Sequence, residues 1–219
     1  MREWLRPLHP FPDETTEIGA PWEIRKIPDT YGRPRRWYGK GGNLLVYQSQ
    51  VYFNPDAGFG VVVLRTGRYR DPESIAHKVA QIYQTAFDFA IGKNVAELYA
   101  GRWLSDDGNS EAITALQDGS LWFLKMVVNG TDIFQSLEGP HPVSKRFGLW
   151  ATGKEDEFRI AVGQATPNGL CFPFWESFDP LYAREAPIDL VLFEGIGLER
   201  SMKVPSVGGT LIRRERQSQ

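Results

Sequence analysis

The sequence is poor in the residues that build disulfides, metal centres and thiol catalysis. Cys171 is the single cysteine, so no intrachain disulfide can form. Histidine occurs only at His9, His77 and His141, none of them near Cys171 in the chain. No His, Cys and carboxylate grouping has metal-ligand spacing, so we expect neither a metal nor a cofactor. The neighbours of Cys171 are apolar, and we expect it to be a small buried residue.

The chain also lacks a strong charge of either sign and a long apolar run. Lysine and arginine number 25 against 27 acidic residues, a formal net charge of −2. That balance argues against nucleic acid or an anionic membrane as the main partner. No apolar run is long enough to span a bilayer, and residues 1–7 do not resemble a secretion signal. The sequence as written therefore predicts a cytoplasmic protein.

Apolar side chains are plentiful, at 42% of the chain, and 13% of residues are aromatic. The first 35 residues are rich in proline and predict an extended lead-in with one strand at 22–27. Two apolar, β-branched stretches, 44–53 and 58–65, flank the turn signal Asn54-Pro55-Asp56-Ala57 and predict an antiparallel hairpin.

A helix is predicted to follow the hairpin. Asp71 and Pro72 suit its N-cap and first turn, and Gly92 is expected to end it. Apolar residues recur at helical spacing and are expected to pack in the core; they are Ile75, Val79, Ile82, Tyr83, Ala86 and Ala90, here called the apolar stripe.

From residue 97 onward the pattern is all-β, without a helix. Aspartate–glycine pairs at 107–108 and 118–119 predict hairpin turns. Short strands with regular turns favour a sandwich or a small barrel. The strands are expected at 121–128, 147–151, 158–162, 188–194, 198–204 and 209–213. The expected organisation is therefore a first domain over 1–93, a β domain over 94–213 and a disordered tail at 214–219.

Several short motifs occur together in one order. They include Trp4-Leu5-Arg6-Pro7, Gly19-Ala20-Pro21-Trp22-Glu23-Ile24 and Tyr38-Gly39-Lys40-Gly41-Gly42, then Pro55-Asp56, Tyr99-Ala100-Gly101-Arg102-Trp103 and Asn129-Gly130-Thr131-Asp132. In this order the chain resembles the C-terminal portion of fungal β-lactamase-related serine hydrolases, which are similar to class C β-lactamases and penicillin-binding proteins. The resemblance implies an α+β fold: the final antiparallel strands and closing helix of a transpeptidase-like domain, followed by an all-β domain.

The resemblance implies acyl transfer by a serine in Ser-x-x-Lys, assisted by that lysine and by a Tyr-x-Asn tyrosine. No serine of this sequence has a lysine three residues on. Tyr52-Phe53-Asn54 fits Tyr-x-Asn only as a pattern, because in the family that motif precedes the lysine strand. We therefore predict no catalytic residue in this chain.

Lys40, Gly41 and Gly42, with Tyr38, are the residues that the resemblance assigns to substrate binding. Gly41 takes the place of the family's hydroxyl residue. Lys40 could bind a carboxylate or carbonyl oxygen if another polypeptide completed the site. The plainer alternative is a solvated lysine on an edge strand, and a basic patch of Arg33, Arg35, Arg36 and Lys40 is most simply exposed strand charge.

Two interpretations assign a function to the chain, and a third is that it has no independent function. The first is a truncated or split serine hydrolase that needs an N-terminal catalytic half, or self-association, through residues 36–92. The second is a binding or cyclase-like module, linked to secondary metabolism, whose β domain encloses a small apolar molecule. Its aromatic residues are Trp103, Trp122, Phe123, Trp150, Phe172, Phe174 and Trp175. A split enzyme predicts exposed apolar surface on residues 36–92, whereas a self-sufficient module predicts that this surface is covered.

Overall fold

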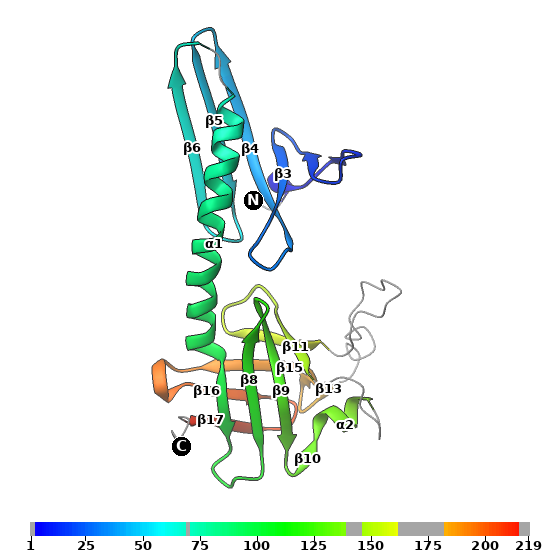
Figure 1. Cartoon of the computed structure of the whole chain (residues 1–219). Helices are drawn as coiled ribbons and strands as arrows, with labels where there is room; N and C mark the ends of the chain where they lie inside the picture. Colours follow the sequence, from blue (N-terminus) through cyan, green and yellow to red (C-terminus); the bar gives the residue numbers. More distant parts are fainter. Residues whose placement is uncertain (1–2, 69–70, 139–145, 162–181, 215–219) are drawn as a thin grey trace. The chain divides into compact units, whose positions relative to one another are not determined.

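A computed structural model describes residues 3–68, 71–138, 146–161 and 182–214 of the chain. The chain forms two compact units, Met1–Gly92 and Lys93–Gln219, each with its own sheet (Figure 1). Within the described ranges, the chain has no helix long and apolar enough to cross a membrane. Cys171, Phe172, Phe174 and Trp175 lie outside these ranges.

Unit 1 holds a six-stranded antiparallel sheet in which every strand pairs with its neighbour in the chain. The expected hairpin is present, and Asn54 shapes its turn by accepting hydrogen bonds from the backbone of Asp56 and Ala57. The lead-in contributes more strands than the sequence predicted, because its first two are very short. The strands are β1 (His9–Pro10), β2 (Thr16–Ile18), β3 (Glu23–Pro28), β4 (Pro34–Leu44), β5 (Tyr47–Asn54) and β6 (Phe59–Thr66), preceded by a 3-10 turn at Glu3–Leu5.

One face of this sheet, here called the inner face, packs against the long helix α1 (Pro72–Tyr99). Trp37 of β4 and Tyr52 of β5 are fully buried there with Ala76 and Ala80 of the helix. Asp71 caps the helix as expected, because its Oδ1 accepts a hydrogen bond from the Glu73 backbone N–H at 3.0 Å.

The predicted end of this helix is wrong. α1 continues through Gly92 to Tyr99. A glycine inside a helix costs only about 1 kcal/mol relative to alanine, and the following residues, Lys93 to Tyr99, contain good helix formers and no proline. The glycine is therefore carried within the helix.

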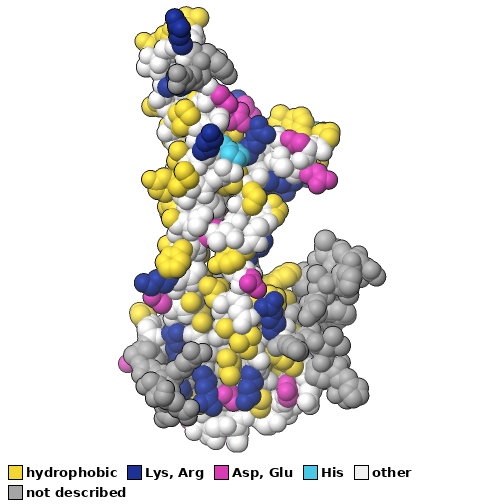
Figure 2. All heavy atoms as spheres, viewed as in Figure 1, with side chains coloured by type: hydrophobic (Ala, Val, Ile, Leu, Met, Phe, Trp, Pro, Cys, Tyr) yellow, Lys and Arg dark blue, Asp and Glu magenta, His cyan; other side chains and the backbone are white. Residues whose placement is uncertain are grey.

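The expected burial of the apolar stripe is also wrong. Ile82 is 71% exposed and Ile75 is 43% exposed, while the helix buries Ala76, Ala80 and Gln84 instead. Phe89, in register with this stripe, is 75% exposed. Hydrophobic side chains lie open over the part of unit 1 that holds α1 and β6 (Figure 2). Periodicity identified an apolar face of the helix correctly, but that face is not the one that meets the sheet.

Unit 2 is a closed antiparallel barrel of eight strands, which fits the barrel alternative of the sequence analysis. The barrel closes where β17 pairs with β7 and β8 pairs with β9. The strands in the barrel are β7 (Gly101–Leu104), β8 (Glu111–Gln117), β9 (Ser120–Val128), β11 (Phe147–Ala151), β12 (Glu157–Ala161), β15 (Leu190–Glu194), β16 (Ser201–Val204) and β17 (Gly209–Arg214). Short additions are β10 (Thr131–Asp132), the pair β13 (Tyr182–Ala183) and β14 (Ala186–Pro187), and a 3-10 turn at Gly197–Glu199.

The sequence missed a short helix in this unit, α2 (Ile133–Glu138). Asp132 begins it by accepting a hydrogen bond from the Phe134 backbone N–H at 2.9 Å. Phe134 packs its ring on Phe147 with centroids 4.1 Å apart, inside the barrel core. A helix of six residues is too short to leave a periodic signal in the sequence.

Aromatic rings fill the barrel core. Trp103 and Phe123 are fully buried, and the Trp103 indole N–H donates to Thr114 Oγ1 at 2.8 Å. Phe193 meets Trp103 edge-on at 5.2 Å. Trp150, by contrast, is 52% exposed on β11. Two of the aromatic residues proposed to enclose a ligand therefore serve as packed core.

Candidate functional site

The glycine-rich segment belongs to β4 in the sheet of unit 1. Lys40, Gly41 and Gly42 pair with β5, whereas the pairing of β4 with β3 ends at Gly39. At Lys40, β4 therefore has a partner strand on one side only. The Lys40 Nζ forms an ion pair with Glu23 Oε1 at 2.6 Å, and both side chains are about half exposed. The Lys40 ammonium group is partly exposed to solvent, but it is already paired with the Glu23 carboxylate.

Tyr38 lies further along β4 within an aromatic cluster. Its ring stacks on Phe53 at 5.6 Å, Phe53 meets Trp22 at 4.9 Å, and Trp22 meets Trp4 at 4.9 Å. Tyr38 is buried, and burial raises the pKa of its hydroxyl above the usual value. The lead-in covers this end of the sheet, so Tyr38 acts in packing there.

The two glycines allow close approach of side chains from β5. A Cβ on Gly42 would lie 2.6 Å from Ser49 Oγ, and one on Gly41 would lie 3.1 Å from Gln50 Oε1. Gly42 pairs with Ser49, and Gly41 pairs with Gln50, across the β4–β5 ladder. A hydroxyl residue in place of Gly41 would require the Gln50 amide to shift by a few tenths of an ångström.

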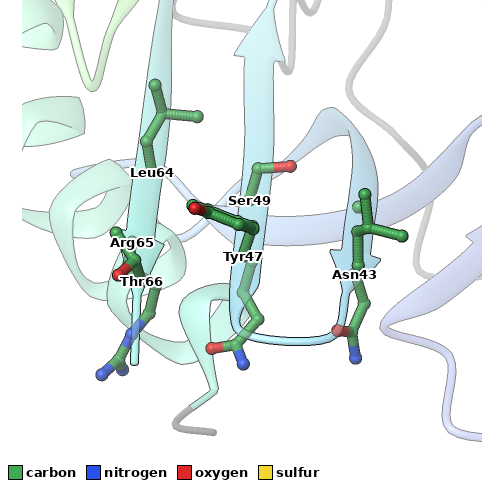
Figure 3. A pocket seen from close by; sticks show the side chains of 9 residues that line it. Asn43, Tyr47, Ser49, Leu64, Arg65 and Thr66 are labelled. Carbon is green, nitrogen blue, oxygen red and sulfur yellow. The ribbon is translucent and has the colours of Figure 1, made fainter. Parts of the chain in front are cut away.

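Two cavities meet at Gly42, and Gly41 lines the smaller of them. The larger, about 460 Å³, lies over the ends of β4, β5 and β6 (Figure 3). It is lined by Gly42, Asn43, Leu44, Tyr47, Gln48, Ser49, Leu64, Arg65 and Thr66. The smaller, about 260 Å³, lies beside the start of α1 and is lined by Glu23, Gly41, Gly42, Asn43, Gln48, Ser49, Gln50, Asp71, Pro72 and Glu73. The sequence assigned Gly41 and Gly42 to binding, and both contribute to these walls. Lys40 does not line the smaller cavity, but its ion-pair partner Glu23 does.

Gln48 and Gln50 are the residues of this region that sequence reasoning missed. Both are almost fully buried, and Gln48 Oε1 has no hydrogen-bond partner among the described residues. The available signal was the alternation Gln48, Gln50, Tyr52 and Asn54 on one strand, with every second residue polar and facing α1. Polar residues at buried strand positions are uncommon and mark sites that need partners.

A charged cluster fixes the start of α1 against the sheet. Glu73 Oε1 accepts hydrogen bonds from Arg25 Nη2 at 2.8 Å and from the Tyr52 hydroxyl at 3.0 Å. Burial and the adjacent Glu73 carboxylate raise the pKa of Tyr52, so it remains a protonated donor. Together with Asn54, whose Nδ2 donates to Gln84 Oε1 at 3.2 Å, Tyr52 therefore has a structural role. The Tyr-x-Asn pattern is engaged in packing.

The predicted basic patch is neutralised by buried carboxylates. Arg33 and Arg35 both bond to Asp29 Oδ2, at 2.8 and 3.0 Å, and Arg36 Nε bonds to Glu17 Oε2 at 2.6 Å. Arg36 lowers the pKa of Glu17. Burial alone would raise the pKa of Asp29, but the donors of Arg33 and Tyr31 outweigh it and lower the pKa.

These depressed pKa values predict that unit 1 loses stability in acid. Glu17 and Asp29 are charged in the folded state at a pH where the unfolded chain already binds protons, so their contribution is present above the unfolded pKa values. We expect the urea midpoint of unit 1 to fall between about pH 5 and pH 3. Asp29→Asn should lower the midpoint at pH 7 and flatten its pH dependence. A variant with the full acid response would contradict the assignment.

The described residues do not gather His, Cys, Asp and Glu side chains into a group of three that could hold a metal ion. The fold thus joins a glycine strand and a covering helix in one unit to a separate barrel in the other. The solved structure of an octameric penicillin-binding protein homologue from Pyrococcus abyssi matches 97% of this chain at 13% identity, with a TM-score of 0.35. The chain spans 41% of that protein.

A sequence relative gives the family. The β-lactamase-like protein str6 of Strobilurus tenacellus is 36% identical over 222 residues, covering 97% of this chain and 71% of the relative. No family model matches the sequence. On the identity and coverage of the fungal relative, this chain belongs to the β-lactamase-like family.

Proposed function

We propose that this chain is a serine-hydrolase-type member of the β-lactamase-like family that does not catalyse acyl transfer by itself. The observation that carries the proposal is chemical: no serine in the 219 residues has a lysine three residues on. A serine without an adjacent base is a poor nucleophile. Tyr52, which fits the tyrosine of the general-base motif, is committed to Glu73.

In this proposal unit 1 supplies the substrate-facing strands and closing helix of a transpeptidase-like domain, and unit 2 is its β domain. Apolar side chains remain exposed on the outer face of the sheet beside the larger cavity, among them Tyr47, Val62 and Leu64. Exposed apolar surface next to a cavity is typical of an interface. A second polypeptide that covered this face could bring a nucleophile to the Lys40 strand.

The alternative of a small-molecule module linked to secondary metabolism has less support. It needs a ligand space in the barrel, whereas Trp103 and Phe123 are core residues there. Phe172, Phe174 and Trp175 lie outside the described ranges.

The test is covalent labelling of the purified chain by a fluorescent penicillin, together with turnover of a chromogenic β-lactam and an activated ester. We expect no label and no turnover above buffer. Lys40→Ala should leave this result unchanged. A time-dependent label mapped to a serine of this chain would overturn the proposal, because it would show an intact nucleophile.

A further inference from the structure

The smaller cavity, beside the start of α1, contains buried amide groups that lack hydrogen-bond partners. Gln48 and Gln50 both line it, two residues apart on β5 and therefore on one face of the sheet. They are only 4% and 3% exposed, and Gln48 Oε1 meets no donor among the described residues. Gln50 Nε2 reaches only the Val51 carbonyl oxygen, at 3.4 Å. An unpaired buried acceptor destabilises the fold, so such a group normally marks a bound water or a ligand.

A position for a ligand atom, here called the Gly41 seat, lies over Gly41. A Cβ built on this glycine would lie 3.1 Å from Gln50 Oε1 and 4.0 Å from Glu23 Oε2. Both atoms are acceptors, and they come from β5 and β3, the two strands that neighbour β4. Because Gly41 has no side chain, the space beside these oxygens is left to a hydrogen-bond donor. The pairing of β4 with β3 ends at Gly39, so β4 is open on one side at the seat.

The wall of this cavity is acidic. Its described lining includes three carboxylates, Glu23, Asp71 and Glu73, and no lysine, arginine or histidine. Lys40 pairs with Glu23 through Oε1 and Arg25 pairs with Glu73, whereas Asp71 forms no ion pair with a described residue. Asp71 also accepts the backbone N–H of Glu73 at the start of α1, which removes a donor that an anion would need. The charge therefore favours a cation over an anion.

A primary ammonium group fits these acceptors. It presents three N–H donors and one positive charge, and the cavity offers Gln50 Oε1, Glu23 Oε2 and Gln48 Oε1. A metal ion fits less well, since the described residues do not gather three His, Cys, Asp or Glu side chains into one group. The volume of about 260 Å³ holds roughly eight water-sized groups at about 30 Å³ each, which limits the ligand to a small molecule.

We propose that the smaller cavity binds a small primary amine, with its ammonium nitrogen in the Gly41 seat and its N–H groups donating to Gln50, Glu23 and Gln48. This preference is opposite to the one that the resemblance gives Lys40, which is for a carboxylate or carbonyl oxygen. The site needs no nucleophile and includes neither Lys40 nor the body of the larger cavity. It is therefore independent of the proposed lack of acyl transfer.

Nuclear magnetic resonance of the full chain, titrated with n-butylammonium at neutral pH, tests the site directly. We expect saturable shifts of the side-chain NH₂ signals of Gln48 and Gln50, with a dissociation constant of about 1 mM. Tetramethylammonium has the same charge but no N–H donor, and it should bind at least about tenfold more weakly. Glycerol, a neutral donor, should bind as weakly as tetramethylammonium. The absence of a saturable shift with n-butylammonium, or equally tight binding of either control compound, would overturn the proposal.

Two variants locate the ammonium group within the cavity. Gly41→Ala fills the seat with a methyl group, and Gln50→Met removes an acceptor while keeping a side chain of similar length. Each should weaken n-butylammonium binding at least about tenfold. The matched control is Gly209→Ala, at a strand glycine of unit 2 with open space around its Cβ position, and it should bind as the wild type does. The backbone amide spectrum verifies each fold, and unchanged binding in either folded variant of the seat would contradict the inference.

Discussion

Replacing Ala80 by glutamate is expected to destabilise unit 1 by about 3–5 kcal/mol, the cost of an uncompensated charge in a packed interface. Ala80 is fully buried between α1 and the inner face of the sheet, close to Trp37 and Tyr52. The matched change Ile82→Glu, two residues away, should alter the free energy of unfolding of the monomer by no more than about 0.5 kcal/mol.

Urea unfolding followed by circular dichroism and tryptophan fluorescence measures both variants. If Ile82→Glu unfolded the unit and Ala80→Glu did not, the helix would face the sheet through its apolar stripe. The structure would then have the wrong face of α1 buried.

The second large effect is expected in the barrel. Trp103→Ala should cost about 3–5 kcal/mol, because it opens a cavity in the core and leaves Thr114 Oγ1 without its indole donor. Trp150→Ala is the control, since the ring at that position is half exposed, and it should cost far less. Thr114→Val in addition to Trp103→Ala separates the hydrogen bond from the packing.

Thermal and chemical unfolding of unit 2 would give these values. Loss of stability of similar size in both tryptophan variants would mean that Trp103 does not occupy the core. A small effect at Trp103 together with tight binding of an apolar dye would favour a ligand space inside the barrel.

Local chemistry made several elements predictable. The Asn54-Pro55-Asp56-Ala57 turn and the Asp71 cap place groups of fixed geometry next to one another in the chain, so short-range rules suffice. The two residue-level errors in α1 have another origin. Gly92 ends a helix only where the flanking residues do not sustain it. An apolar stripe indicates that a helix face is suited to burial, but it does not identify the surface that covers that face.

The sequence predicted the segment that forms the candidate site, but not the side chains that surround it. Lys40, Gly41 and Gly42 form a recognisable segment, but their surroundings depend on register between strands. Pairing across the β4–β5 ladder places Gln50 opposite Gly41 and Gln48 opposite Asn43, and no local pattern of the sequence specifies that register. Glu23, which holds Lys40, comes from a third strand seventeen residues earlier.

The order of strands in the two sheets has a consequence for how the chain acquires its structure. In unit 1 each strand joins the one made just before it, from β1 to β6, so its contacts form over short loops. The barrel closes only when β17 pairs with β7, where Arg213 lies opposite Trp103. Almost the whole sequence of unit 2 separates these two residues. Short loops close faster than long ones, so the first sheet can assemble while the barrel is still being synthesised, and barrel closure sets the pace of folding.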